Sequence, residues 1–208
     1  MRYLHNLLRL SAILAVSACS DSSGPDGSTR LSVLLTDAPG DVLEAVVTIE
    51  QIYLQGGDDE SEDGEGGRVN LLSAPVTVDL LTLADEWMPL IEDAEIPDGQ
   101  YGQLRFVVSG AYLRVEEATG DRIFATSADY DGLPDGAEVG GTLQTPSFSQ
   151  SGLKVTFPGG LALDSETTLL VDFDVAESFG KQAGQDRWIM HPVLKGSVVE
   201  PAAVARRQ

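Results

Sequence analysis

An acidic stretch in the second half of the chain has the residue types and spacing of a cation site. It reads DYDGLPDGAE, and its carboxylates come from Asp129, Asp131, Asp135 and Glu138. Ca²⁺ takes about six to eight oxygen ligands in proteins, and carboxylates on a loop turned by glycine can supply several of them. Asp-Gly and Pro-Asp-Gly also form turns without a metal, so a solvated acidic turn is the alternative interpretation.

The spacing of these acids resembles one calcium-binding half-repeat of the thrombospondin type 3 kind. It contains D-x-D-G-x-x-D in a single copy. It departs from the EF-hand loop, because Leu133 and Pro134 stand at the fifth and sixth positions of that pattern. The resemblance implies Ca²⁺ as the one candidate cofactor, without a second repeat beside it.

A second pair of acids lies on a predicted strand near the end of the folded part. Asp172 and Asp174 are two positions apart, so both carboxylates point to one face of a strand. Paired carboxylates can hydrolyse glycosidic bonds, but nothing else in the sequence marks a cleft. We interpret both acids as structural, and we expect the same of Asp37, whose side chain can fix a turn before the following Ala-Pro.

Other catalytic patterns are missing from the sequence. Beyond the N-terminal region, His191 is the single histidine, and one histidine cannot form a His-based zinc site. No G-x-S-x-G nucleophile elbow and no phosphate-binding glycine loop occurs. We therefore expect a protein that is not an enzyme.

The N-terminal residues 1–18 are predicted to be a secretory signal peptide. Arg2 and Arg9 give a positive start, a short apolar run follows, and small residues precede Cys19. This order defines a signal peptide with its cleavage site. The Val-Ser-Ala-Cys sequence that ends at Cys19 resembles the lipobox of bacterial lipoproteins.

The lipobox resemblance implies that the thiol of Cys19 is diacylated after export and that the new N-terminus is acylated too. Two or more acyl chains hold a protein stably on a membrane. We therefore expect a lipid-anchored protein of the cell envelope. Ser20 follows the cysteine, which by resemblance to enterobacterial sorting favours the outer membrane over the inner membrane.

Composition limits the partners of the chain. Its 208 residues include 33 Asp and Glu against 13 Lys and Arg, for a formal charge of -20. Such a charge argues against nucleic acid and anionic lipid surfaces. It leaves open a cation, a basic partner, or simply a solvated surface. The single cysteine excludes an internal disulfide.

Residues 19–29 are predicted to be a flexible tether, because they are polar and rich in Ser, Asp and Gly. Residues 30–200 suit one domain with a hydrophobic core, and 201–208 a disordered tail. Within the domain, the acidic and glycine-rich segment 56–67 is predicted to be a mobile loop.

The domain is predicted to be all-β, with little helix. Short segments rich in Val, Ile and Thr alternate with Gly, Pro and Asp turns, which favours a single antiparallel β-sandwich of immunoglobulin-like or transthyretin-like type. The acidic stretch 129–141 is predicted to be a loop. The predicted strands are 31–35, 44–54, 69–72, 76–83, 90–96, 101–108, 111–116, 122–126, 153–157, 161–163, 168–175, 187–193 and 197–199.

Some local details are also predicted. Ala45, Val47, Ile49 and Tyr53 should share one face of their strand. Residues 84–87 could form one helical turn. Segments 101–108 and 111–116 are either two strands or one long strand with a glycine bulge at 109–110. Tyr101 suits a corner tyrosine that bonds to backbone.

Several segments together resemble a bacterial lipoprotein family whose shared domain is known only as a domain of unknown function, DUF4382. The resemblance covers about residues 31–193, and it implies a β-sandwich on a lipid anchor and no assigned reaction. The matching segments are LTDAP at 35–39, VVTI at 46–49, IPDGQYGQLR at 96–105, SGLKV at 151–155 and VDFD at 171–174.

The sequence thus predicts a membrane-anchored lipoprotein with a non-catalytic module that binds an unknown envelope protein or glycan, or has a structural role. A calcium-dependent adhesion or glycan-binding module is an alternative, and an envelope polymer hydrolase using Asp172 and Asp174 is a further one. Aromatic residues could stack on sugar rings, although core packing is the plainer interpretation. The candidates are Tyr53, Trp87, Tyr101, Tyr112, Tyr130 and Trp188.

Overall fold

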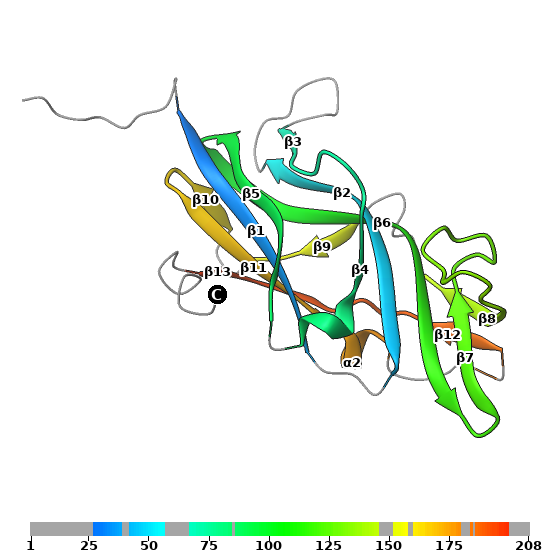
Figure 1. The fold of residues 1–208 in the computed structure, drawn as a ribbon. Helices are drawn as coiled ribbons and strands as arrows, with labels where there is room; N and C mark the ends of the chain where they lie inside the picture. The colour runs from blue at the N-terminus through cyan, green and yellow to red at the C-terminus, as the bar shows by residue number, and fades with distance from the viewer. Residues whose placement is uncertain are drawn as a thin grey trace, which may run out of the picture.

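Two β-sheets face each other in the protein, and their strands cross at an angle (Figure 1). The computed structural model describes residues 27–38, 42–56, 67–84, 86–145, 152–157, 160–179, 184 and 186–199. This arrangement confirms the predicted all-β sandwich with little helix.

The smaller sheet has four strands in the order β13-β11-β1-β5. Its central strands β1 and β11 run parallel, and β5 and β13 pair with them in antiparallel fashion at the two edges. The bounds are Ser28–Ala38 for β1, Met88–Pro97 for β5, Thr167–Asp174 for β11 and Leu194–Val199 for β13. Because β1 begins at Ser28, the domain starts two residues earlier than predicted.

The larger sheet has the order β12-β8-β7-β6-β2-β3, with β9 and β10 also paired to β6 and β4 to β2. Long strand β6 therefore contacts different neighbours along its length. The bounds are Glu44–Gly56 for β2, Arg68–Asn70 for β3, Val76–Asp79 for β4, Gly99–Glu117 for β6, Gly120–Ala125 for β7, Val139–Gln144 for β8, Leu153–Val155 for β9, Leu161–Leu163 for β10 and Arg187–Ile189 for β12.

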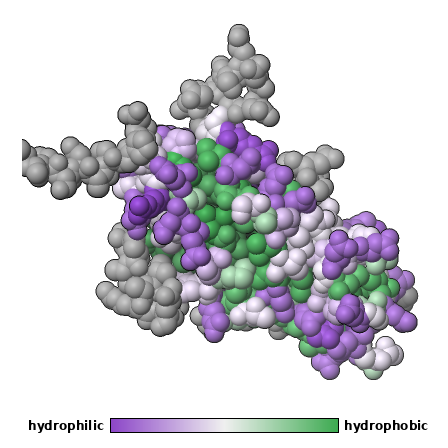
Figure 2. Space-filling view, turned by 45° about the horizontal axis from the view of Figure 1, so that its top comes forward, coloured by the Kyte–Doolittle hydropathy of each residue, from purple (hydrophilic) through white to green (hydrophobic). Residues whose placement is uncertain are grey.

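The hydrophobic core lies between the sheets. Alternate residues of each strand point inward, as the two-residue period of a strand requires. Leu31, Val33 and Leu35 of β1 are fully buried, and Leu104 and Leu113 of β6 oppose them from the other sheet. Figure 2 shows apolar residues (green) in the middle of the face that it presents, with polar residues around them.

Strand β6 runs without interruption from Gly99 to Glu117, so the single long strand is the correct alternative. Its register against β2 shifts at Ser109, which has no partner there. The chain then turns at Gly120 and returns as β7, which pairs with β6 in antiparallel fashion. Tyr101 donates a hydrogen bond to the Pro97 carbonyl over 2.8 Å, which confirms the predicted corner tyrosine.

Strand β2 carries a bulge that overturns one prediction. Ile49 pairs with Val108 and Gln51 with Val107, so Glu50 is an extra residue. A bulge of one residue moves the following side chains to the opposite face. Tyr53 therefore lies on the outer face, not on the inner face with Ile49 as predicted.

Other elements and some strand directions also differ from the prediction. Leu80–Leu83 forms a 3-10 helix (η1) instead of continuing β4, because the Asp79 carboxylate caps it by accepting from Leu81 N. The helical turn predicted at 84–87 thus lies four residues earlier. Strand β8 occupies the end of the predicted acidic loop. Three pairs, β1–β11, β7–β8 and β8–β12, are parallel in an otherwise antiparallel arrangement.

Candidate functional site

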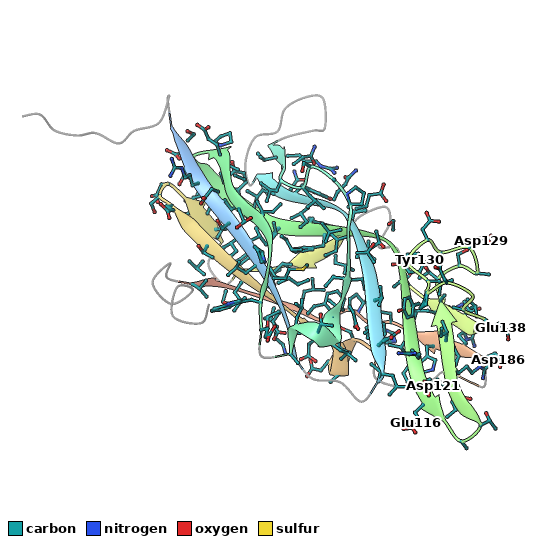
Figure 3. The ribbon with its side chains drawn as sticks, in the orientation of Figure 1. Glu116, Asp121, Asp129, Tyr130, Glu138 and Asp186 are labelled. Carbon is teal, nitrogen blue, oxygen red and sulfur yellow. The ribbon has the colours of Figure 1, made fainter. Side chains whose placement is uncertain are left out.

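One end of the molecule carries a dense group of acidic side chains. It comprises the second half of β6, β7, β8, β12 and the loop 127–138 between β7 and β8, and we call it the acidic end. Figure 3 shows Glu116, Asp121, Asp129, Glu138 and Asp186 there. In Figure 1 the acidic end lies at the opposite end of the molecule from the beginning of β1.

Tyr130 holds the loop of the acidic end against the outer face of the larger sheet. Its ring lies over Gly110 of β6, where an added Cβ would meet ring carbons at 2.4 and 2.5 Å. Its hydroxyl shares a 2.7 Å hydrogen bond with Thr48, and its ring centroid lies 6.4 Å from that of Tyr112. Burial raises the pKa of Tyr130 above its ordinary value.

A small second core forms beneath this loop. Val46, Tyr112 and Ala125 are buried there, and Leu133 of the loop packs against them. Backbone hydrogen bonds close its turns, from Leu133 N to the Tyr130 carbonyl and from Ala137 N to the Pro134 carbonyl. Packing and turn hydrogen bonds therefore account for the loop's conformation.

The four predicted calcium ligands, Asp129, Asp131, Asp135 and Glu138, are exposed. Within the described ranges, no group of three or more His, Cys, Asp or Glu side chains is placed to hold a metal ion. In Figure 3 Tyr130 lies on the side of the loop that faces β6, while Asp129 and Glu138 lie toward its rim. The acids would have to converge around an ion, so calcium binding stays a prediction.

Two arginines of the acidic end, Arg114 and Arg122, are paired with carboxylates. Arg114 forms a salt bridge with Glu44, which also accepts a 2.7 Å hydrogen bond from the Tyr112 hydroxyl. Arg122 forms salt bridges with Asp186 and with Glu117. Hydrogen bonding to Asp186 raises the pKa of the Arg122 guanidinium. The Arg114 pair joins β6 to β2, and the Arg122 pairs join β7 to the end of β6 and to the residue before β12.

Asp37 and Asp174 serve the short helix α2, Val175–Ser178. Asp37, buried at the end of β1, accepts a 3.0 Å hydrogen bond from Val175 N through Oδ1. Asp174 accepts a 2.9 Å bond from Glu177 N, and its Oδ2 lies 2.9 Å from Lys195 Nζ. Helix N-termini leave N–H groups that such side chains satisfy, so both carboxylates bind at the start of α2. For Asp37 this contact differs from the predicted turn before Ala-Pro.

Asp172 lies on the outer face of the smaller sheet, in register with Thr36 of β1 and Lys195 of β13. Among the described residues no donor reaches its buried Oδ1 atom. Burial and then the charge of Asp174 raise the pKa of Asp172. By contrast, the Glu177 N–H and Lys195 lower the pKa of Asp174. The two carboxylates are only two positions apart, yet their surroundings shift their pKa values in opposite directions.

A shallow groove with a volume of about 400 Å³ lies where β7 ends beside β8 and β12. Asp172 and Asp174 do not line it, so it does not combine with them into a hydrolase cleft. Its lining is mostly hydroxyl and amide side chains. The lining residues are Thr126, Thr142, Leu143, Gln144, Thr145 and Ile189.

A cationic area occupies the outer face of the larger sheet, on the first half of β6 and its neighbours. Register places Tyr53 beside Arg105, and Arg105 beside Lys154 of β9. Arg68 of β3 lies with its guanidinium carbon 3.7 Å from the centroid of the Tyr53 ring. We call Arg68, Arg105 and Lys154 together the cationic face.

Sequence reasoning missed the cationic face. The three cations come from strands far apart in the chain, and the Glu50 bulge that turns Tyr53 outward left no local signal. A usable signal was the distribution of acids: β3, β9, and the stretches 51–56 and 99–108 contain no Asp or Glu.

The aromatic residues offered as sugar-stacking candidates are not exposed platforms. Tyr53, Tyr101 and Tyr112 are buried, and Trp87, Tyr130 and Trp188 are half-buried. Trp188 packs edge-on against Phe124 at 6.0 Å between ring centroids. The aromatic side chains therefore serve mainly in packing.

Cys19 and the predicted signal peptide, tether and C-terminal tail lie outside the described residues, apart from the last tether positions, which belong to β1. Within the described part of the chain, no helix is long and apolar enough to cross a membrane.

Comparison with known families gives one match. Residues 28–192 match a family described as a domain of unknown function, DUF4382. No curated protein and no solved structure matches the chain.

Proposed function

The chain belongs to the DUF4382 family, and from its N-terminal sequence and its fold we propose that it is an exported lipoprotein whose sandwich is a non-catalytic binding module of the cell envelope. The observation that carries the proposal is Cys19, which follows a signal-like segment and small residues. The first strand begins at Ser28. A short polar tether thus separates the proposed lipid site from the domain.

The arrangement of the domain supports a binding role. The first strand begins at one end of the molecule and the acidic end lies at the other (Figure 1). An anchor before Ser28 therefore leaves the acidic end and the sheet faces available to other envelope components. The non-catalytic part of the proposal rests on Asp174, both of whose carboxylate oxygens already have partners.

Metabolic labelling tests the anchor. The full chain is expressed in a bacterium that is fed an alkyne-bearing fatty acid, and it is compared with Cys19→Ala and with the matched control Ser20→Ala. We expect label on the wild-type chain and on Ser20→Ala, and none on Cys19→Ala. An unlabelled wild-type chain, or label that persists in Cys19→Ala, would contradict the proposal. Separating the two membranes then tests the expected outer-membrane location.

Calcium binding belongs to the same proposal as a finer statement, and it rests on the spacing of Asp129, Asp131, Asp135 and Glu138. A ligand that binds the folded state raises its stability, by about 1.4 kcal/mol at tenfold excess over Kd. A rise in Tm in millimolar CaCl₂, absent in Asp131→Asn, would support it. An unchanged Tm would leave the acids as a solvated turn.

A further inference from the structure

Strand β13 forms one edge of the smaller sheet, and among the described strands only β11 pairs with it. In Figure 1 it runs beside β11 at the border of that sheet. The other side of β13, which we call the free edge, has no strand beside it. An unpaired edge presents a row of backbone N–H and C=O groups to which another strand can bind.

The other edge strands are protected in ways that β13 is not. Strand β5 contains Pro89 and Pro97, and Asp93 has a φ of 47° where the register against β1 is irregular. Prolines and bulges hinder the addition of a further strand. The short strands at the borders of the larger sheet, β3, β4, β9, β10 and β12, have only three or four residues each. Strand β13 has six residues and no proline.

The register shows which backbone groups point to the free edge. Asp174 N donates to the Val193 carbonyl over 3.0 Å. In an antiparallel pair, residues that bond to the neighbouring strand alternate with residues whose groups point the other way. From Leu194 onward, every second residue of β13 therefore directs its N–H and C=O to the free edge. These residues are Leu194, Gly196 and Val198.

The same residues face the core side of the sheet. Leu194 lies in register with Phe173, and Val198 with Leu169, and both partners are buried in the hydrophobic core. Val198 is nevertheless 59% exposed, as one of two exposed large hydrophobic side chains among the described residues. The free edge thus combines unpaired backbone groups with an apolar side chain that nothing covers in the described part of the chain.

A second copy of β13 complements this edge. In antiparallel pairing about a two-fold axis at Gly196, Leu194 of one copy lies opposite Val198 of the other, and Gly196 lies opposite itself. All three free-edge residues are then hydrogen-bonded, and each exposed valine contacts a leucine. A shift of two residues would place Leu194 opposite Glu200 instead. The interface contacts itself through the same residues on both copies and is therefore closed.

Charge permits this contact although the whole chain is acidic. Between positions 191 and 200 the acidic and basic residues are one Lys195 and one Glu200. Lys195 forms salt bridges with Asp174 and Glu177, and in the pairing it lies opposite Ser197. The two copies of Lys195 are diagonal neighbours about 7–8 Å apart, and each is offset by its own carboxylates. The remaining repulsion between two acidic chains acts at longer range, where salt screens it.

We propose that the protein forms a two-fold dimer in which two copies of β13 pair in antiparallel fashion and join the two four-stranded sheets into one continuous sheet. Main-chain hydrogen bonds provide most of the affinity in this kind of strand addition. An edge of six residues buries less than the roughly 800 Å² per partner of a standard stable interface. We therefore expect a weak dimer, with a Kd of about 100 µM.

Mixed-cysteine cross-linking tests the dimer and its register. Lys195→Cys and Ser197→Cys are made as full chains in a Cys19→Ala background, which removes the single native cysteine. They are purified in nonionic detergent with micelles in excess over protein, and mixed above the expected Kd. Positions 195 and 197 form a non-hydrogen-bonded pair across the interface, with Cα atoms about 4.5 Å apart, which suits a disulfide.

Oxidation by air with copper phenanthroline should give disulfide dimers in the mixture of the two variants and few in either variant alone. Arg30→Cys mixed with Ser197→Cys is the control for random collisions, because Arg30 is an exposed residue of β1, away from the free edge. We also expect the yield of the mixture to rise with NaCl concentration, since salt screens the repulsion between the copies.

Variants at Val198 test the free edge itself. Its N–H points away from β11, so Val198→Pro removes no bond within the sheet but hinders strand addition. Val198→Thr is the matched control, because it keeps the N–H and the branched shape. We expect Val198→Pro to lower the cross-linked yield about tenfold and Val198→Thr to change it little. A melting curve checks folding, and the cysteine mixture alone keeps the test valid if the proline variant does not fold.

Three outcomes would overturn the inference. The first is no disulfide dimer in the mixture, which is also the result if residues 201–208 of the same copy occupy the edge. The others are an equal yield from Ser197→Cys alone and a yield that Val198→Pro leaves unchanged. Because the experiment uses Cys19→Ala, it does not depend on acylation. Failure of the labelling experiment therefore leaves the dimer standing, and failure of cross-linking leaves the anchor standing.

Discussion

The arginines in the two halves of the larger sheet differ in their partners. At the acidic end, Arg114 and Arg122 are each joined to carboxylates. On the cationic face, Arg68 is held by amide oxygens and an aromatic ring. The salt bridges of the acidic end join different strands, whereas Arg68 contacts neutral side chains of neighbouring positions on the same surface. The comparison separates arginines that stabilise the fold through salt bridges from an arginine that contacts neutral groups.

Tyr130 and Tyr53 show the same difference between the acidic end and the cationic face. Tyr130 of the acidic end is packed against a glycine and fixes a loop to the sheet. Tyr53 of the cationic face is itself covered by Arg68 and orders that side chain. We therefore expect substitution of Tyr130 at the acidic end to lower stability, and substitution of Arg68 on the cationic face to leave stability nearly unchanged.

The largest expected effect on stability comes from Tyr130→Ala. The variant removes the ring from the small second core and the hydrogen bond with Thr48. A fully buried aromatic costs about 3–5 kcal/mol on truncation, and for this half-buried ring we expect about 2–3 kcal/mol. Denaturant unfolding measures the free energy.

Tyr130→Phe is the matched control for that variant. It keeps the ring and loses only the hydroxyl, so we expect about 0.5–1.5 kcal/mol. If both variants unfold like the wild-type chain, the loop is not held by Tyr130 and the comparison between the two halves fails.

A pair of glycines on β6 gives the next effect. At Gly110 an added Cβ would meet Tyr130 ring atoms at 2.4 Å, whereas at Gly102 the nearest atom is the Gln55 carbonyl oxygen at 3.9 Å. Overpacking costs about 1–3 kcal/mol. We expect Gly110→Ala to lose about 2 kcal/mol and Gly102→Ala to stay near the wild-type value. Equal melting temperatures for the two variants would contradict the packing difference.

Asp174 and Asp172 extend the comparison to the smaller sheet. Removal of the cap in Asp174→Ala should cost about 1 kcal/mol at neutral pH. The lowered pKa of Asp174 means that its contribution is present above the ordinary value of 3.8 and is lost as pH falls through the lowered pKa.

For Asp172→Asn we expect the opposite sign. The raised pKa of Asp172 means that the ionised form carries a burial penalty, so stability is lost as pH rises from the ordinary value of 3.8 through the raised pKa. The asparagine variant should therefore melt above the wild-type chain at pH 7 and lose this advantage in acid. Tm measured from pH 3 to pH 7 tests both acids, and shifts of the same sign would refute the assignment.

Patterns that depend on neighbouring residues were predictable from the sequence. Alternation of apolar residues predicted most strands, and the position of Tyr101 predicted a hydrogen bond from its hydroxyl to backbone. The spacing of Asp172 and Asp174 gave a shared face, but it could not say that one acid caps α2 while the other loses solvent. That difference comes from Lys195 and from helix α2, and tertiary contacts determine where both of them lie.

Long-range pairings were not predictable. Gly110 and Tyr130 are twenty positions apart, and each looks ordinary in its own segment, a strand glycine and a loop tyrosine. The Glu50 bulge adds one residue to a strand whose composition is uniform, so period-two reasoning put Tyr53 on the inner face. The cationic face depends on that bulge, because without it Tyr53 and Arg68 would not meet.

The smallest expected effect is that of Arg68→Gln on stability, and it sharpens the comparison most. Arg68 is exposed, and its partners are neutral side chains of the same surface. A surface substitution of this kind changes the unfolding free energy by about 0.5 kcal/mol or less. We therefore expect an almost unchanged melting curve. A loss of stability comparable to that of Tyr130→Ala would show that Arg68 holds the fold, and the cationic face would then be a structural feature like the acidic end.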